Sequence, residues 1–228
     1  FDGSTMIYWV SSIFMLLAGV NFSLHFFAWK SKSLSTYIKD SEFKAYLGLL
    51  LSVVIISGLV LMRSPSESFD EVSFSQMFFQ VVSIGTTTGY TSSGYGMWPI
   101  FIPFLLLLLS FVGGSVGSTG GGLKVARCLI LFKQGLREAK RLIHPSAEIV
   151  VKINQKGVDQ KILDSVWGFM SAYIGILVVF TLIMLACGLN ELTAFSAVAA
   201  SLNNLGPGLG AVVAFEEFVV AVHVVNQA

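Results

Sequence analysis

Long apolar runs constrain this chain more than any other feature of its sequence. Residues 6–29, 46–62 and 163–187 are each almost wholly apolar, and a helix needs about 20 such residues to cross ~30 Å of membrane hydrocarbon. Only 12% of the 228 residues are charged, whereas a soluble domain carries about 25%. We therefore predict an all-α, polytopic membrane protein.

A fourth apolar run, residues 97–116, leads into a segment that cannot form a regular membrane helix. Each glycine inside a helix costs about 1 kcal/mol relative to alanine, so we expect a break before the apolar pattern resumes over residues 123–143. The break, here called the glycine tract (residues 113–122), contains Gly113, Gly114, Ser115, Gly117, Ser118, Thr119, Gly120, Gly121 and Gly122. The tract is either a gate in a conduction path or a place where small residues allow close helix packing.

The basic residues set the expected orientation. Residues 30–44 and 124–161 hold four and nine of the 14 Lys and Arg, and such loops face the cytoplasm. The N-terminus and Glu191 should then lie outside. The formal net charge is only +1, so no global basic field points to nucleic acid.

Two further apolar segments, residues 72–84 and 192–202, are too short to span a membrane. Each should enter the membrane and return to the same side, and each is followed by a glycine, Gly89 and Gly206 respectively. These glycines are 117 positions apart. The recurrence predicts an internal repeat, a common property of transporters.

The segments after these short helices are candidate ion-binding loops. Glycine permits positive φ, so successive carbonyl oxygens can face one axis and replace the hydration shell of a monovalent cation, as in potassium channels. The candidate ligands are Thr86, Thr87, Thr88, Gly89 and Tyr90, and in the second copy Asn203, Asn204, Leu205 and Gly206. The alternative is a hydroxyl-rich loop on the outer surface.

Other polar residues carry weaker predictions. Lys124 and Arg127 follow the glycine tract and would act either as an electrostatic barrier to cations or as anchors to lipid headgroups. A cluster of acids could concentrate cations at an outer mouth; it comprises Glu67, Asp70 and Glu71. The three histidines lack metal-ligand spacing, so no catalytic residue and no metal other than a transported ion is expected.

Three runs of the sequence resemble a known family. Residues 83–90, 113–124 and 201–208 are similar to motifs of the Trk/Ktr/HKT superfamily of potassium transporters, and within it to the bacterial TrkH branch. The resemblance implies four repeated units of helix, pore helix, filter loop and helix around a pseudo-fourfold pore. It also implies that Gly89 and Gly206 are filter glycines and that the glycine tract is an intramembrane gating loop.

The resemblance also suggests unit boundaries. Residues 1–44 would hold the closing helix of an upstream unit and a cytoplasmic loop, residues 45–161 a complete pore unit, and residues 162–228 the last unit. The closing helix of that last unit looks incomplete, because residues 209–228 contain Glu216 and Glu217 but lack the arginine expected there. Since two filter loops cannot encircle an ion, the missing units should belong to the same polypeptide or to a second copy.

The expected function is potassium uptake across the bacterial inner membrane through a carbonyl-lined filter, with some sodium passing and no cofactor or bond chemistry. The expected partners are membrane lipid, a second copy in a homodimer, and a cytoplasmic nucleotide-binding ring of the TrkA type. The alternative is an alternating-access transporter that binds a solute at its broken helices.

Overall fold

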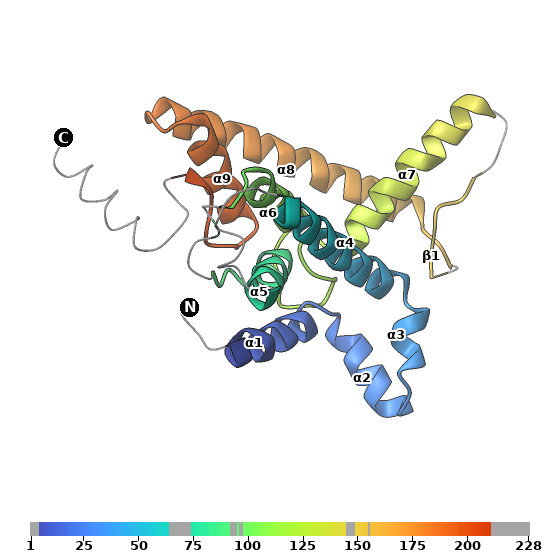
Figure 1. The fold of residues 1–228 in the computed structure, drawn as a ribbon. Helices are drawn as coiled ribbons and strands as arrows, with labels where there is room; N and C mark the ends of the chain where they lie inside the picture. The colour runs from blue at the N-terminus through green and yellow to red at the C-terminus, as the bar shows by residue number, and fades with distance from the viewer. Residues whose placement is uncertain are drawn as a thin grey trace.

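Helices form nearly all of the regular structure in the described part of the chain (Figure 1). This computed structural model describes residues 5–63, 74–91, 95, 98–144, 149–154 and 156–210. The elements are α1 (Thr5–Ala18), α2 (Phe22–Ser31), α3 (Ser35–Lys39), α4 (Ser41–Arg63), α5 (Phe74–Gly85), α6 (Phe101–Val112), α7 (Val125–Ile143), β1 (Lys152–Ile153), β2 (Lys156–Gly157), α8 (Gln160–Ala186) and α9 (Glu191–Leu202). The sequence did not predict the short antiparallel hairpin of β1 and β2 or the five-residue helix α3.

Helices α4 and α8 are long and apolar enough to cross a membrane. They have 23 and 27 residues, and at 1.5 Å per residue they extend about 34 Å and about 40 Å. Both lie where the apolar runs placed them. Helix α8 exposes large apolar side chains, including Ile174 and Phe180, as a lipid-facing span does.

The first apolar run is not the one continuous helix that its composition predicted. It forms α1 and α2, which meet at 91°, with a break between Ala18 and Phe22 that is visible at the bottom of Figure 1. The backbone N–H of Ser115 donates to the Gly19 carbonyl at 2.9 Å, and the N–H of Phe22 donates to the Gly117 carbonyl at 3.1 Å. The glycine tract therefore occupies the bend and bonds to its backbone.

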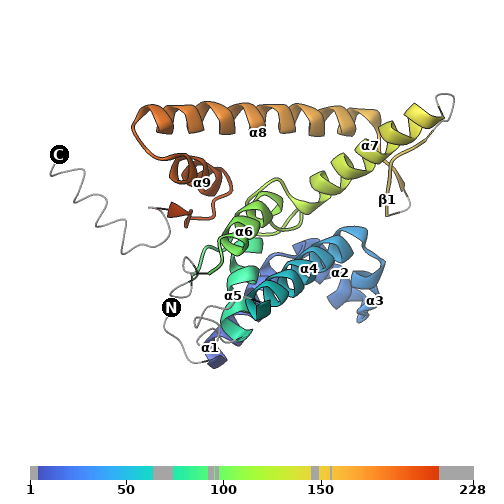
Figure 2. The same ribbon diagram turned by 45° about the horizontal axis from the view of Figure 1, so that its top comes forward.

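The two short apolar segments form the helices α5 and α9. Helix α5 packs among α1, α4 and α6, while α9 lies beneath one end of α8 and also contacts α6 (Figure 2). Each has 12 residues, or about 18 Å, too short to span. We call residues 86–90, which follow α5, loop A, and residues 203–206, which follow α9, loop B.

The glycine tract is an excursion between α6 and α7. The N–H of Leu123 donates to the Phe111 carbonyl at 2.8 Å, and the N–H of Lys124 donates to the Val112 carbonyl at 2.9 Å. The chain thus leaves α6 and returns to the same place, which is the geometry of an Ω-type loop. Helix α6 has only 12 residues, because the tract interrupts the predicted span.

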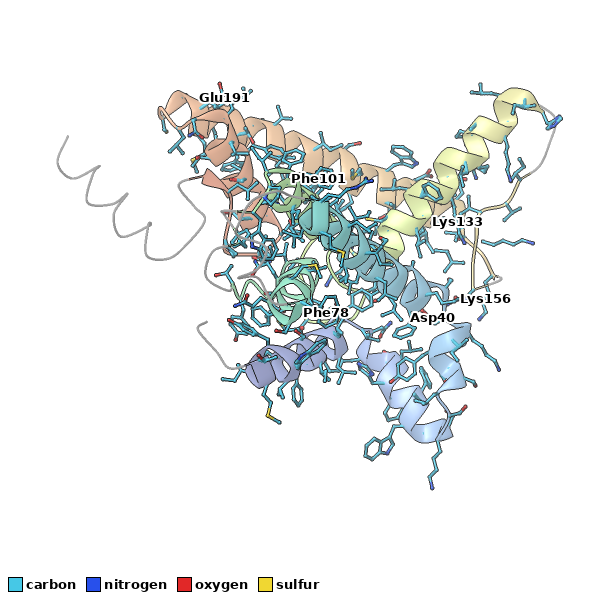
Figure 3. The ribbon with its side chains drawn as sticks, in the orientation of Figure 1. Asp40, Phe78, Phe101, Lys133, Lys156 and Glu191 are labelled. Atoms are coloured by element: carbon cyan, nitrogen blue, oxygen red, sulfur yellow. The ribbon has the colours of Figure 1, made fainter. Side chains whose placement is uncertain are left out.

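Most of the charged residues labelled in Figure 3 lie at one end of the molecule. Figure 3 shows Lys133 and Lys156 at one end and Glu191 at the opposite end. Asp40 lies at the basic end, where its carboxylate accepts a hydrogen bond of 2.8 Å from the Asn154 amide. That the basic end faces the cytoplasm and Glu191 faces out stays a prediction.

Candidate functional site

Loops A and B begin with the same backbone geometry. The N–H of Thr88 donates to the Ser83 carbonyl at 2.8 Å, and the N–H of Leu205 donates to the Ala200 carbonyl at 2.8 Å. Such six-to-one bonds end a helix in a Schellman motif. Corresponding residues are 117 positions apart, so the predicted repeat is present in the backbone.

The motif requires left-handed backbone at the same places in both loops. Thr87 and Asn204 have φ of 56° and 51°, and Gly89 and Gly206 have φ of 82° and 94°. Asparagine adopts this conformation readily, but for β-branched threonine it is uncommon and strained. Thr87 is buried, and its hydroxyl donates to the Thr86 carbonyl at 2.7 Å. Strain that a structure holds in this way often marks a functional position.

The two loops touch through their backbones. A Cβ placed on Gly89 would collide with the carbonyl oxygen of Leu205 and would lie 3.4 Å from the ring of Pro207. Gly206 has open space around it. Position 89 therefore requires glycine for two reasons: its φ is positive, and a side chain would collide with the Leu205 carbonyl.

Loop A is held mainly by its own helix. The Thr86 hydroxyl donates to the Val82 carbonyl at 2.8 Å and lies 2.8 Å from the Thr88 hydroxyl. The Ser83 hydroxyl donates to the Tyr90 carbonyl at 2.6 Å. Loop A is thus bonded to α5 at both of its ends, through Thr86 and Tyr90, and Tyr90 is itself exposed.

Loop B is held from outside its own helix. The Asn203 side chain is fully buried; its carbonyl oxygen accepts from the Tyr173 hydroxyl at 2.7 Å, and its amide nitrogen donates to the Ser110 hydroxyl at 3.2 Å. These partners belong to α8 and α6. The Asn203 side chain thus makes its hydrogen bonds inside the protein, whereas Asn204 is exposed.

The glycine tract lies directly against both loops. The N–H of Gly121 donates to the Thr87 hydroxyl at 2.5 Å. A Cβ on Gly120 would come within 2.7 Å of the Thr86 carbonyl oxygen, and one on Gly121 would collide with the Asn203 carbonyl oxygen. Three segments that are far apart in the sequence therefore converge at one place, and the tract fits there because two of its residues lack side chains.

Sequence reasoning missed one anchor of the tract. The N–H of Val116 donates to the Glu42 carboxylate at 2.7 Å, and Glu42 lies in the first turn of α4. No motif marks this residue, because a single acid at a helix N-terminus is ordinary.

The two cations after the tract have different partners. The Lys124 ammonium group donates to the Gly120 carbonyl, so it folds back onto the tract. The Arg127 guanidinium carbon lies 4.3 Å from the ring centroid of Phe169 on α8, a cation–π contact. Lys124, but not Arg127, therefore contacts the part of the glycine tract that lies against loops A and B.

Some predicted features lie outside the described residues. These are the outer acids Glu67, Asp70 and Glu71 and the closing segment from residue 211 onward, with Glu216 and Glu217. Among the described residues, no group of three His, Cys, Asp or Glu side chains could hold a metal ion.

Comparison with known proteins identifies the family. A family model described as "TrkH: Cation transport protein" matches residues 1–225. The chain belongs to the TrkH family. It is 46% identical over 212 residues to the Trk system potassium uptake protein TrkH of Escherichia coli K12, which covers 93% of this chain and 44% of that protein. It is 37% identical over 202 residues to TrkG of the same organism, covering 89% of this chain and 41% of that protein.

A solved relative has the same fold. The crystal structure of the potassium transporter TrkH from Vibrio parahaemolyticus matches with a TM-score of 0.85 and 46% identity, over 93% of this chain and 46% of that one. The resemblance read from the three motifs is thereby confirmed, and the protein is a bacterial membrane protein. The chain spans less than half the length of these relatives.

Proposed function

We propose that this chain takes part in potassium uptake across the bacterial inner membrane and that loops A and B form part of its selectivity filter. The convergence of both loops on the glycine tract carries the proposal. Each loop follows the C-terminal end of a short helix, and the partial negative charge there favours a cation. The ion would be potassium, with some sodium passing, and the ligands would be oxygens of residues 86–90 and 203–206.

In this proposal residues 45–161 and 162–228 belong to two successive pore units, and residues 1–44 close an earlier one. The offset of 117 positions between matching loop residues supports the division. A full ring around an ion needs further units, which the same polypeptide or a second copy would supply.

The glycine tract would be the gate. Its hydrogen bond to Thr87 and its contact with Asn203 support a closed position against the filter, and its lack of side chains would let it move aside. Lys124, which bonds to the tract, would add a positive charge that opposes cation passage when the tract is closed. The Arg127 guanidinium would instead be held on α8 by its cation–π contact with Phe169.

Partners follow from charge and from family membership. The basic end of the molecule would face a cytoplasmic nucleotide-binding ring of the TrkA type, and a second copy would complete a homodimer in lipid. No bond chemistry is proposed.

The test is ion flux through the intact protein in liposomes, measured as uptake of radioactive rubidium against sodium. The proposal predicts that Gly89→Ser abolishes the preference for rubidium, because the added side chain displaces the Leu205 carbonyl. Gly135→Ser is the matched control, since Gly135 has open space around it. An alternating-access transporter for a solute would keep its ion selectivity in Gly89→Ser, and an intact protein without rubidium uptake would refute potassium uptake.

A further inference from the structure

The two loops differ in what holds them, and the difference lies at matched positions. Thr86 and Asn203 are 117 positions apart and both are buried. The Thr86 hydroxyl donates within its own helix, to the Val82 carbonyl, whereas the Asn203 amide reaches two other helices. Loop B therefore depends on residues outside its own pore-helix segment.

The hydrogen bonds around Asn203 fix the orientation of its amide. Its oxygen accepts from the Tyr173 hydroxyl at 2.7 Å, its nitrogen donates to the Ser110 hydroxyl at 3.2 Å, and Ser110 in turn donates to the Leu107 carbonyl at 2.7 Å. Rotating the amide by half a turn would place its oxygen against the Ser110 hydroxyl, which could donate to it only by giving up its bond to the Leu107 carbonyl, so that orientation loses a hydrogen bond. Asn203 and Ser110 are fully buried and Tyr173 is 8% exposed, so water cannot replace the lost partners.

Fixing this side chain also fixes the backbone of loop B. Asn203 lies directly before the left-handed residue Asn204, and its own carbonyl oxygen faces Gly121 of the glycine tract. Without the two side-chain bonds the backbone of Asn203 would no longer be anchored, and its carbonyl oxygen belongs both to the candidate filter and to the contact with the tract.

We propose that Tyr173 and Ser110 are positioning residues that set the cation selectivity of loop B by holding the Asn203 amide. This inference rests on the proposed function, since it assigns a role within the same filter. Neither residue contacts the ion; both act through Asn203.

The experiment measures the sodium-to-rubidium uptake ratio of the intact protein in liposomes. Tyr173→Phe removes one hydroxyl and keeps the ring, which packs at 6.1 Å from Phe111 and 6.2 Å from Phe169 between centroids. The expected result is a rise of about fivefold in the ratio, the size of one lost neutral hydrogen bond. Tyr37→Phe, whose hydroxyl bonds His25 away from the loops, is the matched control and should leave the ratio unchanged.

A double-mutant cycle separates positioning from general destabilisation. In protein carrying Asn203→Ala, adding Tyr173→Phe should change the ratio no further, because the hydroxyl has lost the group through which it acts. Equal effects in the presence and absence of Asn203 would overturn the proposal, and so would an unchanged ratio in Tyr173→Phe alone.

Ser110→Ala provides an independent variant on another helix if Tyr173→Phe fails to fold. It should raise the ratio in the same direction, whereas Ser12→Ala, which removes another fully buried serine hydroxyl that donates to a helix carbonyl, should not. An unchanged ratio in Ser110→Ala likewise overturns the proposal. Unmodified protein that takes up no rubidium refutes the proposed function, whereas selective protein that is insensitive to both substitutions refutes only this inference.

Discussion

The backbone N–H of Gly121 donates a hydrogen bond of 2.5 Å to the hydroxyl of Thr87. This bond joins the glycine tract to the one residue of loop A that is both β-branched and left-handed, with φ of 56°. The strained residue thus has its side chain on the tract. If the tract is a gate, opening it must break this bond, so the Thr87 hydroxyl contributes to the energy of the closed state.

Thr87→Val should weaken that closed state. Valine has nearly the same shape and the same β-branch, so the substitution removes the hydroxyl with little change in packing. Losing about 1 kcal/mol should raise resting rubidium flux about fivefold. Thr181→Val is the control, since the Thr181 hydroxyl donates only within α8, to the Leu177 carbonyl. Resting flux equal to that of unmodified protein would show that this bond does not hold the gate.

Gly121→Ala tests the fit of the tract against loop B. An added Cβ meets the Asn203 carbonyl oxygen, so the tract must move away and resting rubidium flux should rise. Deleting residues 120–122 should raise the flux further, because the segment that covers the loops is then too short. Gly135→Ala, in open space on α7, should leave flux unchanged and stabilise the helix by about 0.5–1 kcal/mol. A flux that stays at its resting value in both tract variants would argue that the tract is only packing.

Much of this arrangement could be predicted from local composition. Helices α4 and α8 follow from the length of their apolar runs, and α5 and α9 follow from runs too short to span. The break at residue 113 follows from the density of glycine. In each case a property of a few neighbouring residues determines the element.

The bend between α1 and α2 shows why the rest could not be predicted. Residues 6–29 contain no proline and only a single polar amide, at Asn21, so apolar periodicity predicts one helix. Instead, the backbone groups at the bend are hydrogen-bonded by Ser115 and Gly117, which lie about a hundred positions away in the sequence. The same holds for Glu42 and for the Tyr173–Asn203 contact, because no local pattern encodes a partner on another helix.

The two loop glycines, Gly89 and Gly206, should respond differently to alanine. At Gly206 the substitution meets no neighbouring atom, so only the left-handed backbone opposes it, at about 1–2 kcal/mol. At Gly89 the Cβ also collides with the Leu205 carbonyl, so both stability and rubidium selectivity should fall further. The thermal unfolding temperature and the sodium-to-rubidium uptake ratio of the two purified variants show which substitution costs more. Equal losses at the two positions would show that loops A and B do not touch in the membrane.

Glu42 should hold the far side of the tract through the N–H of Val116. Glu42→Ala leaves that N–H without its protein acceptor at an exposed position, where water offsets part of the lost bond, so resting rubidium flux should rise modestly. Glu42→Gln keeps a side-chain oxygen in the same place and should restore most of the closed state. Glu138→Ala removes an exposed acid whose ion pairs lie within α7 and should leave flux unchanged. If Glu42→Gln raised flux as much as Glu42→Ala, the charge of Glu42 rather than its hydrogen bond would be what holds the tract.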